Sequence, residues 1–515
     1  PNILLLVADH GGVVSVNRRR NVITGSCPYL YAWDGERFRF VSDFLGSGAL
    51  GLAVTRDLTW PPDPVEIVRI GDAREFRPRD GRYAITLTSE LREVDYFDSL
   101  RLIAVDHPAT VEVQPTDSFM PPPVTPSGLW AVGDEIPLTA AHDSDGRDVT
   151  ESLRRIDGRF AAPGEILPPP LRGVCRPIGY TLEFAAIPTE GPLVLAVTGL
   201  LEFGTASSNI ALSQTSSASF VWPTLEAEGA DGRWQPVPVN IGIPDGRTKT
   251  NVCDLAGKIP AGTRRLRLTT SFQIYWDRIA LLRRQALPAT QVHERAFSRA
   301  DLGWRGFSRM QVAADGLTRV PVFSDVTEQP PWRTTVEGWC TRYGDVQELI
   351  TETDGKIAVL NGGDALALEC PEAAFPSVPA GFTRTFFLAV VGWDKEENAN
   401  TVAGDTVGPL PGQPPTVSGE NDLPDDWTQR FNTREIDSVG GLAKVMPKWA
   451  FFTVFFALAS VGLPGLNGFV GEFFTLQGVF LSNVMLGPWY AASAAFSMVL
   501  GAIYILYMLG KIVFG

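Results

Sequence analysis

The stretch between Lys448 and Lys511, near the C-terminus, carries one charged side chain, the carboxylate of Glu472. A helix that crosses a bilayer needs about 20 predominantly apolar residues, so this stretch has room for about three crossings. A carboxylate at bilayer depth costs roughly 3 kcal/mol or more, and it usually faces a helix bundle or a water-filled path. The stretch therefore predicts a membrane segment, with Glu472 as a candidate proton-relay group.

Proline and glycine divide this apolar stretch. The sequence predicts a first span over 449–463, an interruption at 464–468, a second helix over 469–481 with Glu472 in its first turn, and a third span over about 489–509. Broken helices are tolerated in a membrane only where protein or a polar cavity surrounds them, and in transporters they mark ion and substrate sites. The simpler interpretation is a loop between two ordinary anchor helices, which leaves Glu472 solvated near the membrane surface.

Several short motifs flank and interrupt these spans. They are Thr433-Arg434-Glu435-Ile436, Gly440-Gly441-Leu442-Ala443-Lys444, Met446-Pro447, Ala457-Leu458-Ala459-Ser460-Val461-Gly462-Leu463-Pro464-Gly465 and Gly468-Phe469-Val470-Gly471-Glu472-Phe473. Through these motifs, residues 433–515 resemble subunit M of the bacterial NADH:quinone oxidoreductase, respiratory complex I. The resemblance implies that Glu472 belongs to the proton path of an antiporter-like subunit. The earlier helices of that family, with their own buried lysine and glutamate, have no counterpart upstream, so we expect this segment alone to anchor rather than to pump.

Apolar and polar residues alternate through most of the chain before residue 413, as they do in half-buried strands. Tyr83, Ile85 and Leu87 provide one example. Asp-Gly pairs suit tight turns, because glycine adopts positive φ and aspartate bonds its neighbouring backbone. They stand at 34–35, 80–81, 145–146, 157–158, 231–232, 245–246, 315–316 and 354–355. The predicted fold is mostly β, with two or three antiparallel sandwiches, followed by an all-α transmembrane segment of about three helices, one of them interrupted.

The composition changes along the chain predict five segments. They are an N-terminal strand and connector (1–25), two β-rich modules (26–290 and 291–412), a linker rich in proline and acidic residues (413–432), and the transmembrane segment (433–515). Proline and acidic residues without apolar periodicity are typical of a linker.

A second resemblance covers residues 26–412. Its motifs are Cys27-Pro28-Tyr29-Leu30-Tyr31-Ala32-Trp33-Asp34-Gly35, Val105-Asp106-His107-Pro108, Ile274-Tyr275-Trp276-Asp277-Arg278, Gly303-Trp304-Arg305-Gly306-Phe307, Thr341-Arg342-Tyr343-Gly344-Asp345-Val346 and Val391-Gly392-Trp393-Asp394-Lys395. They are similar to the C-terminal region of large bacterial proteins that carry FG-GAP, ASPIC/UnbV or tetratricopeptide repeats upstream. This likeness implies an exported, β-rich module in the periplasm or at the cell surface, and it supplies no catalytic residues.

The first twelve residues predict a buried strand and a turn that presents Asp9 and His10. They resemble a metal-binding strand of the sulfatase and alkaline-phosphatase superfamily, which implies that Asp9 and His10 hold a divalent cation. No Cys/Ser-x-Pro-x-Arg nucleophile motif follows, and four histidines in the whole chain equip a metal hydrolase poorly. Three stretches that resemble three unrelated families leave four interpretations open: a natural fusion, a chimeric gene model, an assembly artefact or a designed sequence.

Two acidic loops are candidate calcium sites. Asp394, Glu396 and Asn398 follow a 1,3,5 spacing, while Asp143, Asp145 and Asp148 surround a glycine. Calcium prefers several hard oxygen ligands from a flexible loop, although neither loop has the complete EF-hand pattern. Solvated acidic turns are the alternative interpretation, and calcium is the one cofactor that the sequence suggests.

Charge and missing motifs exclude several function classes. A net charge of −14 argues against nucleic acid, because phosphate binding needs a basic face. The five cysteines show no CxxC spacing, which disfavours zinc. Neither a Gly-x-Ser-x-Gly elbow nor a phosphate-binding loop is present, so independent catalytic activity is not expected.

Two functions from different classes remain. The first is a membrane-tethered, extracytoplasmic β-rich interaction module, whose partners are the lipid bilayer and other protein chains. The second is a membrane component of a complex I-like proton-translocating assembly, in which Glu472 relays protons. The orientation is open: Arg434, Lys444 and Lys448 flank the first span and favour a cytoplasmic start, which conflicts with the exported character of the β region.

Overall fold

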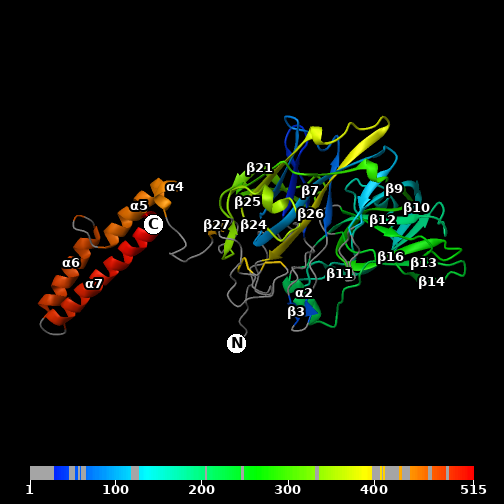
Figure 1. Cartoon of the computed structure of the whole chain (residues 1–515). Helices are drawn as coiled ribbons and strands as arrows, with labels where there is room; N and C mark the ends of the chain where they lie inside the picture. The colour runs from blue at the N-terminus through cyan, green and yellow to red at the C-terminus, as the bar shows by residue number, and fades with distance from the viewer. Residues whose placement is uncertain are drawn as a thin grey trace. The chain divides into compact units, whose positions relative to one another are not determined.

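A computed structural model shows a chain that is mostly antiparallel β-sheet and ends in a few helices (Figure 1). It forms two compact units, Pro1–Arg430 and Phe431–Gly515, hereafter the β unit and the helical unit. The structure describes residues 28–45, 53–55, 58–59, 65–116, 127–202, 204, 206–244, 249–330, 336–396, 406–408, 410–411, 428–431, 441–461, 465, 467–482 and 486–514. The predicted cation ligands Asp9, His10 and Asn398 lie outside these residues, as does most of the predicted linker.

Two sheets of the β unit share one hydrophobic cluster. Leu30 and Leu87 contribute to it from the first sheet, and Leu102 and Leu388 from the second. The first sheet has the order β2-β1-β6-β25-β19-β23, with bounds Phe38–Asp43, Tyr29–Trp33, Arg82–Thr88, Asp364–Pro371, Arg299–Trp304 and Gly344–Asp345. The second has the order β18-β7-β26-β5, with bounds Val292–Ala296, Glu93–Pro108, Phe382–Glu396 and Glu66–Asp72, and β24 (Ala358–Asn361) also pairs with β7.

Two further sheets share a second cluster. Its members include Leu182 and Leu268 from one sheet and Leu195 and Ile279 from the other. One has the order β10-β11-β16-β13-β14, with bounds Leu138–Asp143, Val174–Phe184, Arg265–Phe272, Thr224–Glu228 and Trp234–Val237. The other has the order β15-β12-β17-β9-β8, with bounds Lys249–Asp254, Leu193–Leu201, Ile274–Gln285, Leu129–Ile136 and Glu112–Pro115.

Smaller elements connect these sheets. The hairpin β20–β21 (Phe307–Val312 and Arg319–Thr327) packs Phe323 edge-on against Tyr31 of β1. The remaining elements are the short strands β3 (Ala53–Thr55), β4 (Leu58–Thr59), β22 (Trp339–Thr341) and β27 (Thr428–Phe431), the helices α1 (Thr150–Leu153), α2 (Ala206–Ser213) and α3 (Gln347–Ile350), and the 3-10 turns η1 (Ala289–Gln291) and η2 (Glu372–Ala374).

The strand pairing differs from the linear division expected at residue 290. Strand β7 pairs with β26 from Glu93↔Glu396 to Pro108↔Phe382, so segments from opposite ends of the β-rich region form one sheet. All strands between 112 and 285 belong to the second pair of sheets. Antiparallel partners need not be close in the sequence, so the composition changes that suggested consecutive modules could not reveal this interleaving.

The predicted local structure is confirmed in the described part of the β unit. The alternation at Tyr83, Ile85 and Leu87 lies in β6. Seven of the eight Asp-Gly turns have their glycine at positive φ, for example 109° at Gly35, while Gly246 lies outside the described residues.

The helical unit consists of α4 (Leu442–Val445), α5 (Pro447–Ser460), α6 (Asn467–Leu481), α7 (Pro488–Leu509) and a π-helical turn, η4 (Gly510–Phe514). Ala450 and Ala457 of α5 pack against Leu509 and Val513 at the end of the chain. Figure 1 shows α7 running beside both α5 and α6. The chain between α5 and α6 includes Gly465, whose φ of +100° is unfavourable for other residues.

The number of complete spans differs from the predicted three. Among the described helices, the segment Pro488–Phe514 alone is long and apolar enough to cross a membrane, with a mean hydropathy of 1.9. Helices α5 and α6 have 14 and 15 residues, and at about 1.5 Å per residue each is shorter than the roughly 30 Å hydrocarbon core. The predicted interruption is present, and it separates two half-length helices rather than two full spans.

Candidate functional sites

Glu472 lies in α6, just after the interruption in the helical unit. Its side chain is partly buried, and its Oε2 atom is buried without a hydrogen-bond partner among the described residues. Thr475, one turn further on, donates its hydroxyl to the Gly471 carbonyl instead. A carboxylate with an unused oxygen on a broken apolar helix can accept a proton from water or from a neighbouring chain, which is the arrangement that a relay requires.

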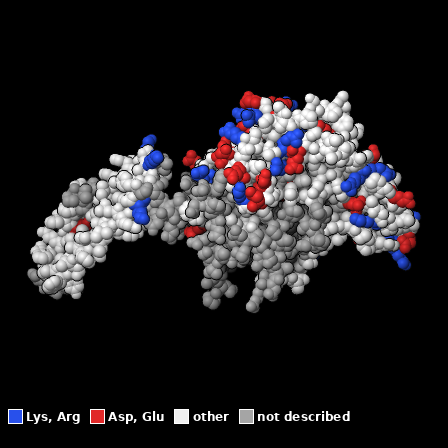
Figure 2. Space-filling model, viewed as in Figure 1, with Lys and Arg blue, Asp and Glu red and all other residues white. Residues whose placement is uncertain are grey.

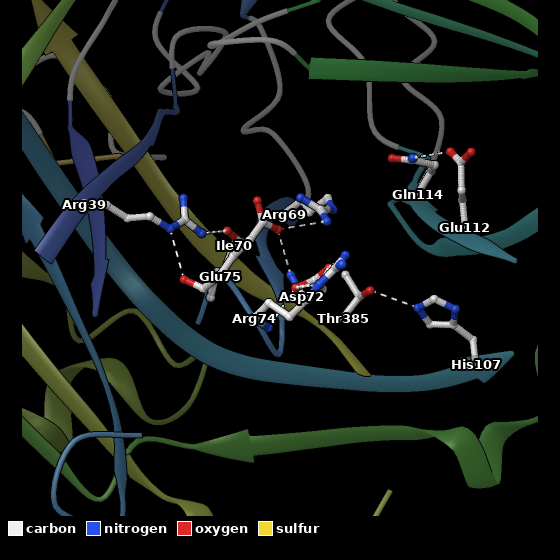
Figure 3. Close-up of polar contacts among 10 residues, drawn as sticks. All are labelled: Arg39, Arg69, Ile70, Asp72, Arg74, Glu75, His107, Glu112, Gln114 and Thr385. Atoms are coloured by element: carbon white, nitrogen blue, oxygen red, sulfur yellow. Dashed lines mark hydrogen bonds and ion pairs between the residues drawn. The ribbon is translucent and has the colours of Figure 1, made fainter. Parts of the chain in front are cut away.

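A polar groove in the β unit is the second candidate site. It has a volume of about 1170 Å³ and lies among β2, β5, β8 and neighbouring loops. Figure 3 shows ten residues of this region, all of which line the groove. Its charged and titratable lining residues are Arg39, Asp43, Glu66, Arg69, Asp72, Arg74, Glu75, His107, Glu112, Glu135, Arg154, Arg155, Lys249 and Arg278.

One wall of the groove is held by arginine contacts to backbone carbonyls. Arg39 donates from Nη2 to the Ile70 carbonyl at 2.6 Å and from Nε to the Glu75 carbonyl at 3.0 Å (Figure 3). Glu75 in turn accepts the backbone N–H of Asp72 at 2.9 Å. The hydrogen bond from Arg74 lowers the pKa of Asp72 and outweighs the opposing effect of burial. These contacts fix the end of the edge strand β5.

The other wall pairs one arginine with two glutamates. Arg278 donates from Nη1 to Glu112 at 2.9 Å and from Nη2 to Glu135 at 2.6 Å. His107, which also lines the groove, bonds the Thr385 hydroxyl through Nε2 at 2.9 Å and donates from Nδ1 to the Pro108 carbonyl at 3.0 Å. Most basic side chains of the groove therefore face carboxylates, so the groove presents paired charges rather than a field of one sign.

The predicted calcium loop at 143–148 has its carboxylates engaged by protein donors. Asp143 accepts the N–H groups of Asp145 and Arg147 and pairs with the Arg147 guanidinium at 2.5 Å. Asp145 also pairs with Arg147, at 2.9 Å. Asp148 accepts the hydroxyl of Thr150 at 2.6 Å and its N–H at 2.9 Å, and these bonds lower the pKa of Asp148. The structure thus shows a hydrogen-bonded turn here, and calcium binding stays a prediction.

The other predicted calcium loop begins in β26. Asp394 and Glu396 lie in this strand, where they are paired with Asp95 and Glu93 of β7. Over the described ranges, no group of three or more His, Cys, Asp or Glu side chains is arranged to hold a metal ion. The four cysteines in these ranges form no disulfide, and burial raises the pKa of Cys253 to about 12.

Comparisons with known proteins bear on the helical unit. Residues 427–501 match the family model described as NADH:quinone oxidoreductase/Mrp antiporter, TM. NADH-quinone oxidoreductase subunit M of Rhodobacter capsulatus is 46% identical over 86 residues, which cover 17% of this chain and 16% of the relative. The subunit M of Rickettsia bellii is 41% identical over 87 residues, or 17% of either chain, and NADH-ubiquinone oxidoreductase chain 4 of Marchantia polymorpha is 41% identical over 86 residues, again 17% of either chain.

The chain thus spans about a sixth of the length of the curated relatives it matches. The predicted resemblance of the C-terminal segment to subunit M is confirmed, and with it the membrane character of that segment. The groove, by contrast, was not predicted. Its residues come from positions between 39 and 385, so no local motif marked it.

Proposed function

We propose that this protein is a membrane-tethered interaction module, in which the helical unit is the anchor and the β unit, folded as two β-sandwiches, binds partners outside the cytoplasm. The observation that carries the proposal is the exposed apolar surface of the helical unit. Phe456 is 62% exposed and Trp489 is 86% exposed. Figure 2 shows charges of both signs on the β unit and few on the helical unit. Exposed aromatic side chains at this density need lipid or other helices around them.

The polar groove supports the interaction role of the β unit. Its charges are already oriented by intramolecular contacts, such as those of Arg39 and Arg278, so a ligand meets a preformed site. Preorganised polar groups cost little ordering entropy on binding. The groove suits a polar ligand without large net charge, such as an extended peptide segment of another protein chain, because basic groups such as Arg278 and Lys249 already pair with carboxylates there.

A membrane extraction experiment tests the anchor. The full chain, expressed in bacteria, should stay in the membrane pellet after an alkaline carbonate wash. Protease added to intact spheroplasts should then digest the β unit if that unit is extracytoplasmic. Release of the intact chain into the supernatant would refute the tether. Protection of the β unit in spheroplasts, together with digestion after lysis, would place that unit in the cytoplasm instead.

A second function, membership of a complex I-like proton-translocating assembly, is favoured by the unpartnered Oε2 atom of Glu472 and by the family match over 427–501. In that role, partner helices would complete the proton path that one spanning helix and two half-length helices cannot form alone. Purified chain in liposomes should show no proton uptake without partners. In membranes that contain partners, Glu472→Gln should reduce proton uptake. Ser493→Ala, which removes a hydroxyl from α7, is the control and should not reduce it. Equal uptake by the wild-type and Glu472→Gln chains would eliminate this role.

A further inference from the structure

We propose that a groove between α5 and α7 of the helical unit, hereafter the α5–α7 groove, binds an anionic phospholipid, with one acyl chain along the groove and the phosphate at Lys448 and Lys511. The groove has a volume of about 560 Å³. Ligand pockets usually have about 300–1,000 Å³, so this space is large enough for a bound molecule. The proposal rests on the anchor role of the helical unit, and it adds the class of lipid that the anchor selects.

The walls of the α5–α7 groove are apolar faces of two helices. The α5 wall includes Trp449, Phe452, Phe456 and Ser460, and the α7 wall consists of Ile505 and Met508. The rings of Phe452 and Phe456 stack with their centroids 6.4 Å apart. The Ser460 hydroxyl donates to the Phe456 carbonyl at 2.9 Å, so its hydrogen is already bonded within the helix. The groove therefore offers an acyl chain an apolar surface.

The length of the α5–α7 groove matches one leaflet of a bilayer. Trp449 and Ser460 are eleven positions apart, which is about 16 Å along a helix at roughly 1.5 Å per residue. The hydrocarbon core is about 30 Å thick, so one leaflet contributes about 15 Å. Trp449 lies near the start of α5, and tryptophan is enriched at the membrane surface. An acyl chain that enters beside Trp449 can therefore follow the groove to the end of α5.

Two lysines extend the walls of the groove toward the membrane surface. Lys448 is exposed, lies one helical turn before Phe452, and makes no ion pair with any described residue. Lys511 lies in η4, three residues after Met508. Residues three or four apart on a helix share a face, so each lysine is in line with one wall. Lysine side chains can place their ammonium groups at the membrane surface while their stems stay in apolar surroundings.

Both lysines lie at the same end of the helical unit. Ala450 of α5 and Val513 of η4 belong to one hydrophobic cluster, so the start of α5 and the end of η4 lie together. Figure 2 shows the basic groups of the helical unit at the end where Figure 1 labels α4. The described acidic residue of this unit, Glu472, is in α6 and does not line the groove. The described charge at the outer end of the groove is therefore positive, which complements an anionic headgroup.

Tryptophan quenching in liposomes tests the lipid site. In the full chain with Trp489→Phe, Trp449 is the one tryptophan left in residues 433–515, and a brominated acyl chain quenches it on contact. Mixtures of brominated phosphatidylglycerol with unlabelled phosphatidylcholine, and the reverse mixtures, give the relative affinity for the two lipids. We expect a preference of roughly 10- to 30-fold for phosphatidylglycerol, because each of two lysines near the surface contributes about a fivefold gain.

Two pairs of variants separate the site from general effects of charge and bulk. Lys448→Gln should lower the preference about fivefold. Lys444→Gln is its control, because Lys444 is also exposed but lies in α4 outside the groove lining, and it should cost less than about twofold. Thr453→Phe should lower the preference at least as much as Lys448→Gln, because Thr453 lines the groove and the ring would fill it. Ala459→Phe adds bulk to α5 outside the lining and should leave the preference unchanged.

Three results would overturn the lipid site. Equal affinity for the two lipids would show that the groove selects no anionic occupant. Equal losses in Lys448→Gln and Lys444→Gln would assign the preference to diffuse surface charge. An unchanged preference in Thr453→Phe would place the lipid outside the groove.

Flotation of the liposomes on a density gradient distinguishes this failure from failure of the anchor. A chain that floats with the lipid but shows no preference refutes the lipid site alone. A chain that does not float refutes the anchor, and the lipid site with it.

Discussion

The β unit buries its large apolar side chains, whereas the helical unit exposes many of them. In the β unit, leucines such as Leu30 and Leu388 are completely buried between sheets, and the strands that bury them are far apart in the sequence. In the helical unit, Phe456 and Trp489 are largely exposed, although α5 packs on the end of the chain as well as on its sequence neighbours. The difference teaches that the first unit completes its own core by long-range pairing, while the second depends on a surrounding apolar medium to cover it.

The largest expected effect on the difference between the two units comes from placing charged residues on the exposed apolar face of α7. Leu500→Arg combined with Ile503→Arg should release the chain from membranes, because each arginine at the centre of a span costs about 2.5–3.5 kcal/mol. The measurement is the fraction that stays in the pellet after an alkaline wash. Leu500→Ala combined with Ile503→Ala should remain membrane-bound. Full retention of the double arginine variant would contradict the assignment of α7 as a span.

Removing a buried charge from the β unit should have a somewhat smaller effect, which is a loss of folding stability. Arg384 donates to both oxygens of the buried Asp106, at 2.7 and 2.8 Å, and His293 contacts the same carboxylate at 3.2 Å. Arg384→Met should lower the free energy of unfolding of the β unit by about 3–5 kcal/mol, because it leaves Asp106 buried without its main partner. Denaturant unfolding in detergent measures this change.

The matched surface substitution is Arg74→Met. Its guanidinium pairs with Asp72 at 2.6 Å but is 87% exposed, so we expect a loss of at most about 1 kcal/mol. Equal losses for Arg74→Met and Arg384→Met would mean that burial does not set the strength of these pairs.

The pH dependence of stability tests the buried carboxyl of Asp95. Its pKa is about 7 in the folded chain, against 3.8 for an ordinary aspartate. The unfolded chain therefore releases this proton at lower pH than the folded chain does, and the β unit should lose stability as the pH rises from about 4 to about 7, by up to roughly 1.4 kcal/mol per pH unit. The measurement is denaturant unfolding in EDTA over this range. Asp95→Asn should flatten the curve, and an equally steep curve in that variant would assign the proton to another group.

The last prediction concerns the close approach of the Gly363 backbone to the Trp304 ring. A Cβ at Gly363 would lie 2.2 Å from the ring of Trp304, and the φ of Gly363 is +97°. A Cβ at Gly316, where φ is +67°, meets nothing within 4 Å. Gly363→Ala should therefore cost about 1–3 kcal/mol more than Gly316→Ala, because both share the backbone strain and only the first overpacks. Equal Tm values for the two variants would contradict the tight packing of Trp304.

Local structure could be predicted well from the sequence, and the candidate sites only in part. The alternation at 83–87 and the glycine of each described Asp-Gly turn identified strands and reversals, because both signals lie within a few residues. The apolar stretch around Glu472 identified the membrane segment and its interruption. The predicted bounds 449–463 and 469–481 lie close to those of α5 and α6, which have 14 and 15 residues. The number of complete spans was overestimated, because a helix of this length is too short to cross the hydrocarbon core.

The sequence by itself determined which environment surrounds each unit. Alternating apolar and polar residues in the β unit require one face of each strand to be buried. The uncharged run from 449 to 471 requires lipid or protein around it. Only the tertiary structure decided which groups meet. Asp95 faces Asp394 although the two lie near opposite ends of the β-rich region, and Arg39 reaches Ile70 across the groove wall. The physical reason is that side-chain polarity is a local property, whereas antiparallel register between distant strands depends on the packing of the whole core.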